Sequence, residues 1–342
     1  MSPSRAAMAE PTAKAELLED RGAAAASDQF FRSRPFLDAE TATHTLRIET
    51  ADGRELVAPL LVREIPPADE GAAAAASLRD AISPYGYPGL VPTDPGDRHF
   101  PPTGGEMAIT PLDPGAIDFS ATGLVSVFLR HTLGPPPLTG TTERNLVQLA
   151  DPALAPKSRP SDRRQVRRNL EAGYTLELVP GAETTPAQRA GFLDLYEQTM
   201  RRTAAADHYF FGAAYFDRAL AADRTWLALA TAPDGALAAA SIAAVSDGFL
   251  HYYLSGSADS HLRDSPMKNV VAALSEHAAA LELPLNLGGG ISRGDALEEF
   301  KRGFANRELA WHTSELVCDR EAYARLSATR PESGFFPAYR AP

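Results

Sequence analysis

The stretch TWLALATAPDGALAAASIAAVSDGFLHYYLS, residues 225–255, decides the fold. Three apolar runs alternate here with two short turns, and each turn contains an Asp-Gly pair. Runs of this kind separated by such turns form antiparallel hairpins. The runs cover residues 225–231, 237–246 and 249–255, and the turns contain Asp234-Gly235 and Asp247-Gly248.

Alternating helices and strands are predicted on both sides of these three strands. Thr185-Pro186-Ala187-Gln188 is a capping box with proline at the first helical position, and it predicts the start of a helix. The other predicted elements are a strand at 175–179, a helix at about 213–222, a helix from Ser265-Pro266 to about residue 281, a strand at 283–289, a helix at 295–304 and a strand at 308–317. The order β-α-α-β-β-β-α-β-α-β indicates an α/β domain.

The first half of the chain carries weaker signals of the same class. Alternating apolar residues at 43–50 and 55–65 flank Asp52-Gly53, which predicts a β-hairpin. Further strands are expected at 125–130 and 145–150. At 342 residues the chain is long enough for two domains. We expect residues 1–20 to be disordered, 21–155 to form the first domain and 156–330 the second.

Composition excludes several classes of function. Cys318 is the only cysteine, so a disulfide within the chain and a cysteine zinc cluster are both impossible. The eight histidines show no metal-binding spacing, and we expect no metal. A net charge of −11 argues against a DNA-coating protein. The N-terminus has no apolar core segment, and no run reaches the ~18 apolar residues of a membrane span, so we expect a cytoplasmic protein.

The element order resembles the acyltransferase fold of the GCN5-related N-acetyltransferases (GNAT) over residues ~170–320. In that fold the pyrophosphate of acyl-CoA rests on backbone N–H groups at the helix after the fourth strand, within an Arg/Gln-x-x-Gly-x-Gly/Ala motif. Here the segment is SADSHLRDSPMKN, residues 257–269. It has no glycine, carries Asp264 near the expected phosphate, and loses one N–H donor to Pro266. Acyl-CoA is therefore disfavoured as the donor.

One branch of this fold lacks the glycine loop, and the chain resembles it over residues ~80–320. This is the Fem family, which has two such domains in tandem and takes its acyl group from aminoacyl-tRNA. The long helical arm that some members carry is absent. The segments that carry the resemblance are Ser83-Pro84-Tyr85-Gly86-Tyr87, the basic run 162–168, Leu195-Tyr196, Tyr215-Phe216, His251-Tyr252-Tyr253-Leu254, Gly288-Gly289-Gly290, Phe300-Lys301 and Gly303-Phe304.

The resemblance implies an α/β fold of two tandem GNAT-like acyltransferase domains with mixed, mostly antiparallel sheets. It implies an aminoacyltransferase that uses aminoacyl-tRNA as co-substrate, with no other cofactor, and forms an amide on a peptide-like acceptor. That acceptor is a small-molecule or carrier-bound one, either a peptidyl natural-product intermediate or a peptidoglycan precursor. An acyl-CoA-dependent N-acyltransferase and a non-catalytic binding module of the same fold remain alternatives.

The resemblance also implies site residues. Lys301 is the predicted catalytic cation that stabilises a tetrahedral oxyanion, with Phe300 beside it. Arg163, Arg164, Arg167 and Arg168 share one helical face, as a phosphate-binding or a merely solvated surface. Tyr252 and Tyr253 alternate on a strand, so only one faces the cleft. The predicted substrate-binding residues are Tyr85, Tyr87, Tyr209, Tyr252, Tyr253, Gly289 and Gly290.

Overall fold

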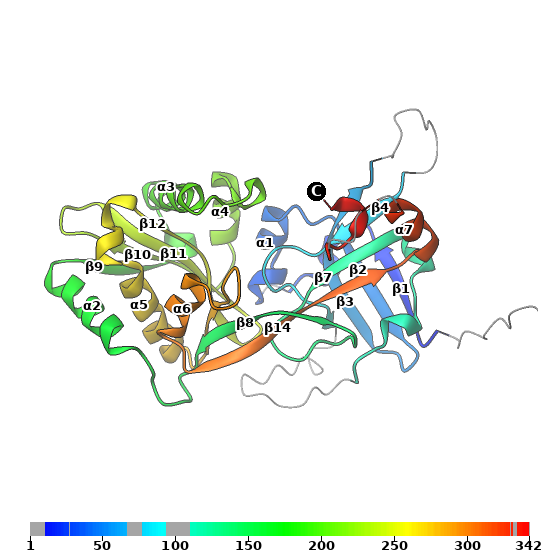
Figure 1. Ribbon diagram of the computed structural model, residues 1–342, viewed down its shortest axis with the longest axis horizontal. Helices are drawn as coiled ribbons and strands as arrows, with labels where there is room; N and C mark the ends of the chain where they lie inside the picture. The colour runs from blue at the N-terminus through cyan, green and yellow to red at the C-terminus, as the bar shows by residue number, and fades with distance from the viewer. Residues whose placement is uncertain are drawn as a thin grey trace, which may run out of the picture.

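The computed structural model describes residues 11–26, 28–66, 77–93, 110–328, 330 and 334–341. The fourteen strands of these residues form one sheet that runs the length of the molecule (Figure 1). Its strand order is β6-β1-β2-β3-β4-β7-β14-β8-β13-β12-β11-β10-β9, with β5 paired to β3.

The two halves of the chain build the two ends of this sheet. The first half comprises β1 (Ala13–Leu18), α1 (Arg34–Ala39), β2 (His44–Thr50), β3 (Glu55–Glu64), β4 (Arg79–Ile82), β5 (Val91–Pro92), β6 (Ile117–Asp118), β7 (Leu124–Arg130) and β8 (Thr142–Ala150). The second comprises α2 (Pro160–Glu171), β9 (Thr175–Pro180), α3 (Pro186–Arg202), α4 (Ala213–Leu220), β10 (Thr225–Thr231), β11 (Leu237–Ser246), β12 (Phe249–Ser257), α5 (Met267–Ala280), β13 (Leu285–Gly288), α6 (Ala296–Arg302), β14 (Arg307–Val317) and α7 (Arg320–Ser327).

Every helix and strand predicted between residues 175 and 317 is present. The capping box is confirmed, because Thr185 Oγ1 accepts from the Gln188 backbone and Gln188 Oε1 accepts from the Thr185 backbone. Strands β10, β11 and β12 pair antiparallel, as the two turns predicted. Helices α3 and α4 cover one face of this part of the sheet, and α2, α5 and α6 lie on the other (Figure 1).

In the first half, the predicted hairpin is confirmed as β2 and β3, paired from His44–Leu60 to Glu49–Glu55. The expectation of disorder through residue 20 was wrong for residues 13–18. They form β1, which pairs along its whole length with β2 and places Ala13 and Ala15 in the core. The period-two burial of two small alanines is too weak a signal to read against a polar background. Residues 1–10 lie outside the described residues.

The halves are joined through strands as well as through packing. The start of β14 pairs with β8, and its end, from Thr313 to Val317, pairs with β7. Strand β8 also pairs with β13, so both strands belong to the middle of one sheet. The domain boundary near residue 155 stays a prediction.

A segment of the first half also enters the core of the second. Phe30, Phe31 and Phe36 pack with Phe192, Tyr196 and Phe216 beneath α3 and α4. Arg32, fully buried, forms an ion pair with Asp247 in the β11–β12 turn, with its Nη2 2.5 Å from Asp247 Oδ1. Burying these rings from both halves together gives the junction a fixed geometry. In the described part of the chain, no helix is long and apolar enough to cross a membrane.

Candidate active site

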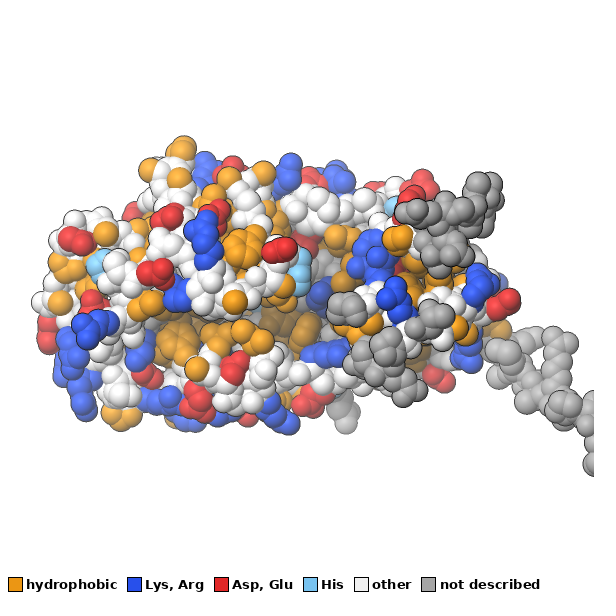
Figure 2. All heavy atoms as spheres, turned by 45° about the horizontal axis from the view of Figure 1, so that its top comes forward, with side chains coloured by type: hydrophobic (Ala, Val, Ile, Leu, Met, Phe, Trp, Pro, Cys, Tyr) orange, Lys and Arg blue, Asp and Glu red, His pale blue; other side chains and the backbone are white. Residues whose placement is uncertain are grey.

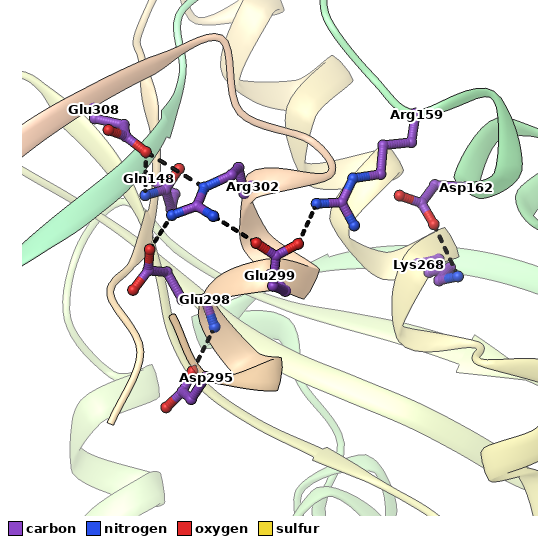
Figure 3. A network of polar contacts seen from close by, with 9 residues as sticks. All are labelled: Gln148, Arg159, Asp162, Lys268, Asp295, Glu298, Glu299, Arg302 and Glu308. Atoms are coloured by element: carbon purple, nitrogen blue, oxygen red, sulfur yellow. Dashed lines mark hydrogen bonds and ion pairs between the residues drawn. The ribbon is translucent and has the colours of Figure 1, made fainter. Parts of the chain in front are cut away.

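Helix α6 carries Lys301 and is held in place by ion pairs on two sides (Figure 3). Asp295 caps its N-terminus by accepting from the Glu298 backbone at 2.8 Å. Arg302 pairs with Glu298, Glu299 and Glu308. Glu299 also pairs with Arg159, the residue that precedes α2, at 2.7 Å. These contacts tie α6 to both α2 and β14 and fix the direction of the Lys301 side chain.

Lys301 itself is buried, with 8% of its surface exposed. Its Nζ donates to the Gly289 backbone oxygen at 2.6 Å. An ammonium has three N–H donors, and Lys301 has no other hydrogen-bond partner among the described residues. Burial lowers the pKa of Lys301 to about 8, against a smaller opposing effect of Asp295. Lys301 is thus a cation near neutral pH with two donors left for a ligand.

Tyr87 reaches the same place from the other half of the chain. A Cβ added at Gly288 would lie 3.1 Å from Lys301 Nζ and 3.8 Å from the Tyr87 hydroxyl, so both polar groups flank this glycine. Gly288 has φ +75°, which side-chain-bearing residues rarely adopt. Burial raises the pKa of Tyr87, so its hydroxyl stays protonated as a neutral hydrogen-bond donor. Lys301 and Tyr87 therefore converge at the junction of the two halves.

A chain of buried hydrogen bonds holds the backbone beside Lys301 and Tyr87 in place. His251 Nε2 donates to the Ser246 backbone oxygen at 3.1 Å, and its Nδ1 accepts from Asn286 Nδ2 at 3.0 Å. Asn286 Oδ1 in turn accepts from the Gly288 backbone at 2.8 Å. Burial lowers the pKa of His251 to about 4, so the ring stays neutral. His251 is therefore a structural histidine with both ring nitrogens hydrogen-bonded, and this chain of contacts fixes the backbone at Gly288.

Tyr85 and Tyr253 lie one step further along the same surface. The Tyr85 backbone donates to Glu40 Oε2 at 2.8 Å, and the Tyr215 hydroxyl donates to Glu40 Oε1 at 2.6 Å. The ring centroid of Tyr85 lies 5.8 Å from that of Tyr209 and 6.1 Å from that of Tyr253. In the loop SPYGYPG, residues 83–89, Tyr87 therefore lies beside Lys301 and Tyr85 lies in a half-buried aromatic cluster.

Two of the predicted residues point to the other face of the sheet. Tyr252 packs against the core beneath α5, and its hydroxyl donates to Ser255 Oγ at 2.6 Å. Phe300 packs in that same core, with its ring centroid 5.7 Å from that of Phe304. Tyr253, not Tyr252, is the tyrosine of this strand that faces Tyr85. The structure thus places Tyr252 and Phe300 away from the site beside Gly288 where Lys301 and Tyr87 converge.

Gly289 and Gly290 are explained by protein side chains that lie against them. A Cβ at Gly289 would lie 2.6 Å from Asn145 Nδ2, and one at Gly290 would lie 2.5 Å from Asp295 Oδ1. Real Cβ atoms do not approach so closely. These glycines therefore allow β8 and the cap of α6 to pack against the strand end, whether or not substrate passes there.

The four arginines of α2 form an exposed surface at the end of the molecule, where Lys and Arg side chains gather in Figure 2. Their contacts are local. Arg163 donates to the Ser158 backbone oxygen at 2.5 Å, and Arg167 lies 3.6 Å from Glu171. Arg168 reaches only Gln165, at 3.4 Å, and Arg164 has no charged partner within 4.0 Å among the described residues. The structure does not bring this surface into contact with Lys301.

Several residues of the site carry no signal in the sequence. Phe31 contacts Tyr87 and His251, with centroids 5.4 Å and 4.9 Å apart, and Trp311 of β14 contacts Tyr87 at 5.6 Å. Phe31 belongs to the Phe30-Phe31 pair of a short 3-10 turn and Trp311 to a strand, and only tertiary structure shows that they meet Tyr87. On the face in Figure 2, hydrophobic side chains line a hollow near the middle of the molecule.

A cavity of about 700 Å³ lies elsewhere, between the sheet of the first half and the C-terminal segment. It contains none of the predicted site residues. Ile65, Ile82, Phe128, Phe336 and Tyr339 are among the residues that line it.

Comparison with known proteins agrees with this architecture. A family model described as an acetyltransferase (GNAT) domain matches residues 156–302. The crystal structure of FemX is 11% identical to the chain, covers 89% of it and 96% of FemX, and superposes with a TM-score of 0.56. No curated protein sequence matches the chain.

Two other solved structures match more weakly. The structure of L-PGS from Bacillus licheniformis is 10% identical, covers 57% of this chain and 69% of that one, and has a TM-score of 0.44. A tandem GNAT protein from the clavulanic acid biosynthesis pathway is 11% identical, covers 80% and 82%, and has a TM-score of 0.40. The family match and the FemX likeness establish the fold: two tandem GNAT-like acyltransferase domains with mixed, mostly antiparallel sheets.

Proposed function

We propose that this protein is a Fem-type aminoacyltransferase that moves an amino acid from aminoacyl-tRNA to the free amine of a peptide-like acceptor. The observation that carries the proposal is the convergence of Lys301 Nζ and the Tyr87 hydroxyl beside Gly288. A buried ammonium with two uncommitted donors, next to a neutral hydroxyl, suits a reaction that develops negative charge on a carbonyl oxygen.

The chemistry assigns a role to each group. The acceptor amine attacks the ester carbonyl of the aminoacyl-tRNA, a C–N bond forms, and the tetrahedral oxyanion accepts hydrogen bonds from Lys301 and Tyr87. The C–O bond to the terminal ribose then breaks, the ribose oxygen takes a proton, and the amine loses one. Removing a preorganised donor of this kind typically costs 10²–10³-fold in rate.

The N-terminus of α5 supports tRNA over acyl-CoA as the donor. The backbone N–H groups of Lys268 and Asn269 already donate to the oxygens of Ser265 and Pro266, at 3.0 and 2.9 Å. Asn169 and Gln165 of α2 donate to the Asp264 backbone oxygen and cover this turn. An anion at a helix N-terminus needs free N–H groups, and here two of them are used internally.

The exposed arginines of α2 are the proposed contact for the tRNA backbone. Four guanidinium groups on one helical face present forks that suit phosphate oxygens. Since the FemX likeness is one of fold, the tRNA dependence rests on these features of the chain and on the resemblance of its motifs.

The test is a transfer assay with a total tRNA pool charged with radiolabelled amino acids and a panel of short peptide acceptors. Half of the reactions receive RNase A before the enzyme. We expect RNase-sensitive label in an amide product, which is lost in Lys301→Met and kept in the exposed control Lys14→Met.

Two outcomes would redirect the proposal. Activity that appears only with acyl-CoA would identify an unusual CoA-dependent N-acyltransferase. No transfer from either donor, with a cellular phenotype that depends on the α2 arginines but not on Lys301, would identify a binding module. Varying the amino acid on the tRNA would then name the group transferred.

A further inference from the structure

Arg130, the last residue of β7, is a half-buried cation. Its Nη1 donates to the Ser83 backbone oxygen at 2.6 Å, and its guanidinium carbon lies 5.3 Å from the centroid of the Phe128 ring. Among the described residues no carboxylate lies within 4.0 Å of it, and its Nε and Nη2 donate to nothing. Buried charges are normally paired, because desolvation is otherwise uncompensated.

The groups around Arg130 are mostly hydrogen-bond donors. Ser83 begins the loop that carries Tyr85, and the hydroxyls of Tyr85 and Tyr209 have no partner among the described residues. Burial lowers the pKa of Arg130, and Glu40, Tyr85 and Tyr209 are close enough to oppose that shift. Glu40 is occupied by the Tyr85 backbone and the Tyr215 hydroxyl. The cluster therefore offers uncommitted donors and a cation at a partly open surface.

The cluster around Arg130 lies a short distance from the proposed reaction site at Lys301 and Tyr87. Tyr85 and Tyr87 are two residues apart in the loop, which spans at most about 7 Å. On β12, Tyr253 contacts Tyr85 and His251 contacts Tyr87, and two residues of a strand also span about 7 Å. A dipeptide has a similar separation between its amine and its carboxylate.

We propose that Arg130, together with the hydroxyls of Tyr85 and Tyr209, binds the free carboxylate of the acceptor. Resting on the proposed function, this names the acceptor class: an amino acid or short peptide whose carboxylate lies about two residues from the attacking amine. The guanidinium fork matches a planar carboxylate. Glu40 in the same cluster disfavours a phosphate dianion, because it repels two negative charges more strongly than one.

The cavity of about 700 Å³, which Arg63, Arg330 and Arg340 line together with apolar residues, begins next to this subsite. Ile82 precedes Ser83, and Phe128 lies two residues before Arg130 on the same face of β7; both line the cavity. An acceptor that extends beyond its carboxylate-bearing residue has room there.

The experiment is calorimetric titration of the full chain, without tRNA, with alanyl-alanine and with alanyl-alaninamide. The variants are Arg130→Gln, Arg130→Lys and the matched control Arg144→Gln. Arg144 stacks on the same Phe128 ring at 5.6 Å but is already paired with Glu315. Thermal unfolding of each variant shows that it is folded.

We expect the wild type to bind the carboxylate peptide about 10–100-fold more tightly than the amide, the range for a charge-assisted pair. Arg130→Gln removes this preference, Arg130→Lys keeps part of it, and Arg144→Gln leaves it intact. Equal affinity for the two peptides, or no measurable binding of either, would overturn the proposal. Tighter binding of 2-aminoethyl phosphate than of alanyl-alanine would overturn the choice of carboxylate.

The transfer assay separates this inference from the proposed function. With the same peptides, Arg130→Gln raises KM for alanyl-alanine about 10-fold or more and changes kcat little. Efficient transfer to both peptides alike would refute the carboxylate subsite and leave the aminoacyltransferase standing. If calorimetry shows the preference for the carboxylate but no amino acid is transferred from aminoacyl-tRNA, the carboxylate subsite stands and the aminoacyltransferase function is refuted.

Discussion

Helices α2 and α6 both carry basic side chains, and the structure gives them opposite environments. On α2 the arginines Arg163, Arg164, Arg167 and Arg168 are exposed and make only local contacts. On α6 a single lysine, Lys301, is buried beside Gly289 while its neighbour Arg302 takes three carboxylates. The α2 charges remain exposed to solvent, whereas burial lowers the pKa of Lys301 to about 8.

The difference shows what each cation is able to do. A solvated arginine stabilises an approaching anion by long-range attraction that salt screens. A desolvated ammonium acts over one hydrogen bond, in a low dielectric, on charge that develops at a fixed place. We therefore expect α6 to determine the rate of transfer and α2 to determine the affinity for tRNA.

The largest expected effect is that of Lys301→Met on the chemical step. The side chain keeps its volume but loses the donor to the oxyanion, so we expect kcat to fall by about 10²–10³-fold. Single-turnover kinetics with charged tRNA measures it. The control Lys14→Met, which changes an exposed side chain of strand β1, should be indistinguishable from wild type. If kcat of Lys301→Met lies within fivefold of the wild-type value, Lys301 does not stabilise the oxyanion and α6 has only a structural role.

The next largest effect is the removal of the α2 cations. Changing all four arginines to glutamine should lower kcat/KM for aminoacyl-tRNA by about 10–50-fold while kcat at saturation stays near wild type. The slope of log affinity against log salt should become shallower by up to about 3, from four lost phosphate contacts. The control removes four exposed arginines elsewhere, namely Arg201, Arg218, Arg320 and Arg325. If the two sets weaken tRNA binding equally, α2 is only part of a general charge effect.

A third contrast is pH dependence. Because the pKa of Lys301 is about 8, the ammonium is lost as pH rises through 8, and kcat should fall about 10-fold per pH unit above it. Arginine keeps its charge at any pH used, so Lys301→Arg should show a flat profile over this range, at a lower rate. An unchanged decline in Lys301→Arg would assign the titration to another group.

Sequence patterns predicted the elements better than they predicted the site. The elements between residues 175 and 317 were predictable because two of their turns contain Asp-Gly pairs and because α3 and α5 begin next to a proline, whereas α7 carried no such signal. Strand β1 was not, because its buried residues are two alanines in a polar segment. Lys301 and Tyr87 came from motif resemblance, and the structure shows that they converge.

Other parts of the site were invisible in the sequence because they depend on contacts between distant segments. Phe31 and Trp311 approach Tyr87 from positions more than fifty residues away on either side. Arg130 is one arginine among many, and it is marked only by its burial with no carboxylate of the described residues within 4.0 Å. Tyr252 and Tyr253 illustrate the limit, since alternation says that one faces the site but not which one.

The smallest expected effect is on stability, and it again separates the two helices. Burying the Lys301 ammonium is unfavourable, which is why its pKa in the folded chain, about 8, lies below the ordinary lysine value of 10.5. The pKa shift corresponds to an unfavourable free energy of roughly 3 kcal/mol for the buried ammonium, which Lys301→Met removes. The same substitution loses the hydrogen bond to Gly289, which costs about 1–1.5 kcal/mol. Lys301→Met should thus raise the free energy of unfolding at pH 7 by about 1–2 kcal/mol, whereas the α2 substitutions should change it by less than about 0.5 kcal/mol.

The sign of this effect can be checked through its pH dependence. Below pH 8 the lysine is protonated in both states, so the gain from Lys301→Met is largest there. Between pH 8 and 10.5 the unfolded chain binds a proton that the folded chain does not, so the wild type gains stability and the difference shrinks. Urea unfolding at pH 7 and pH 9.5 measures it. A gain that is constant with pH would mean that Met packs better in this site, and that the cost of burying the charge is not what distinguishes α6 from α2.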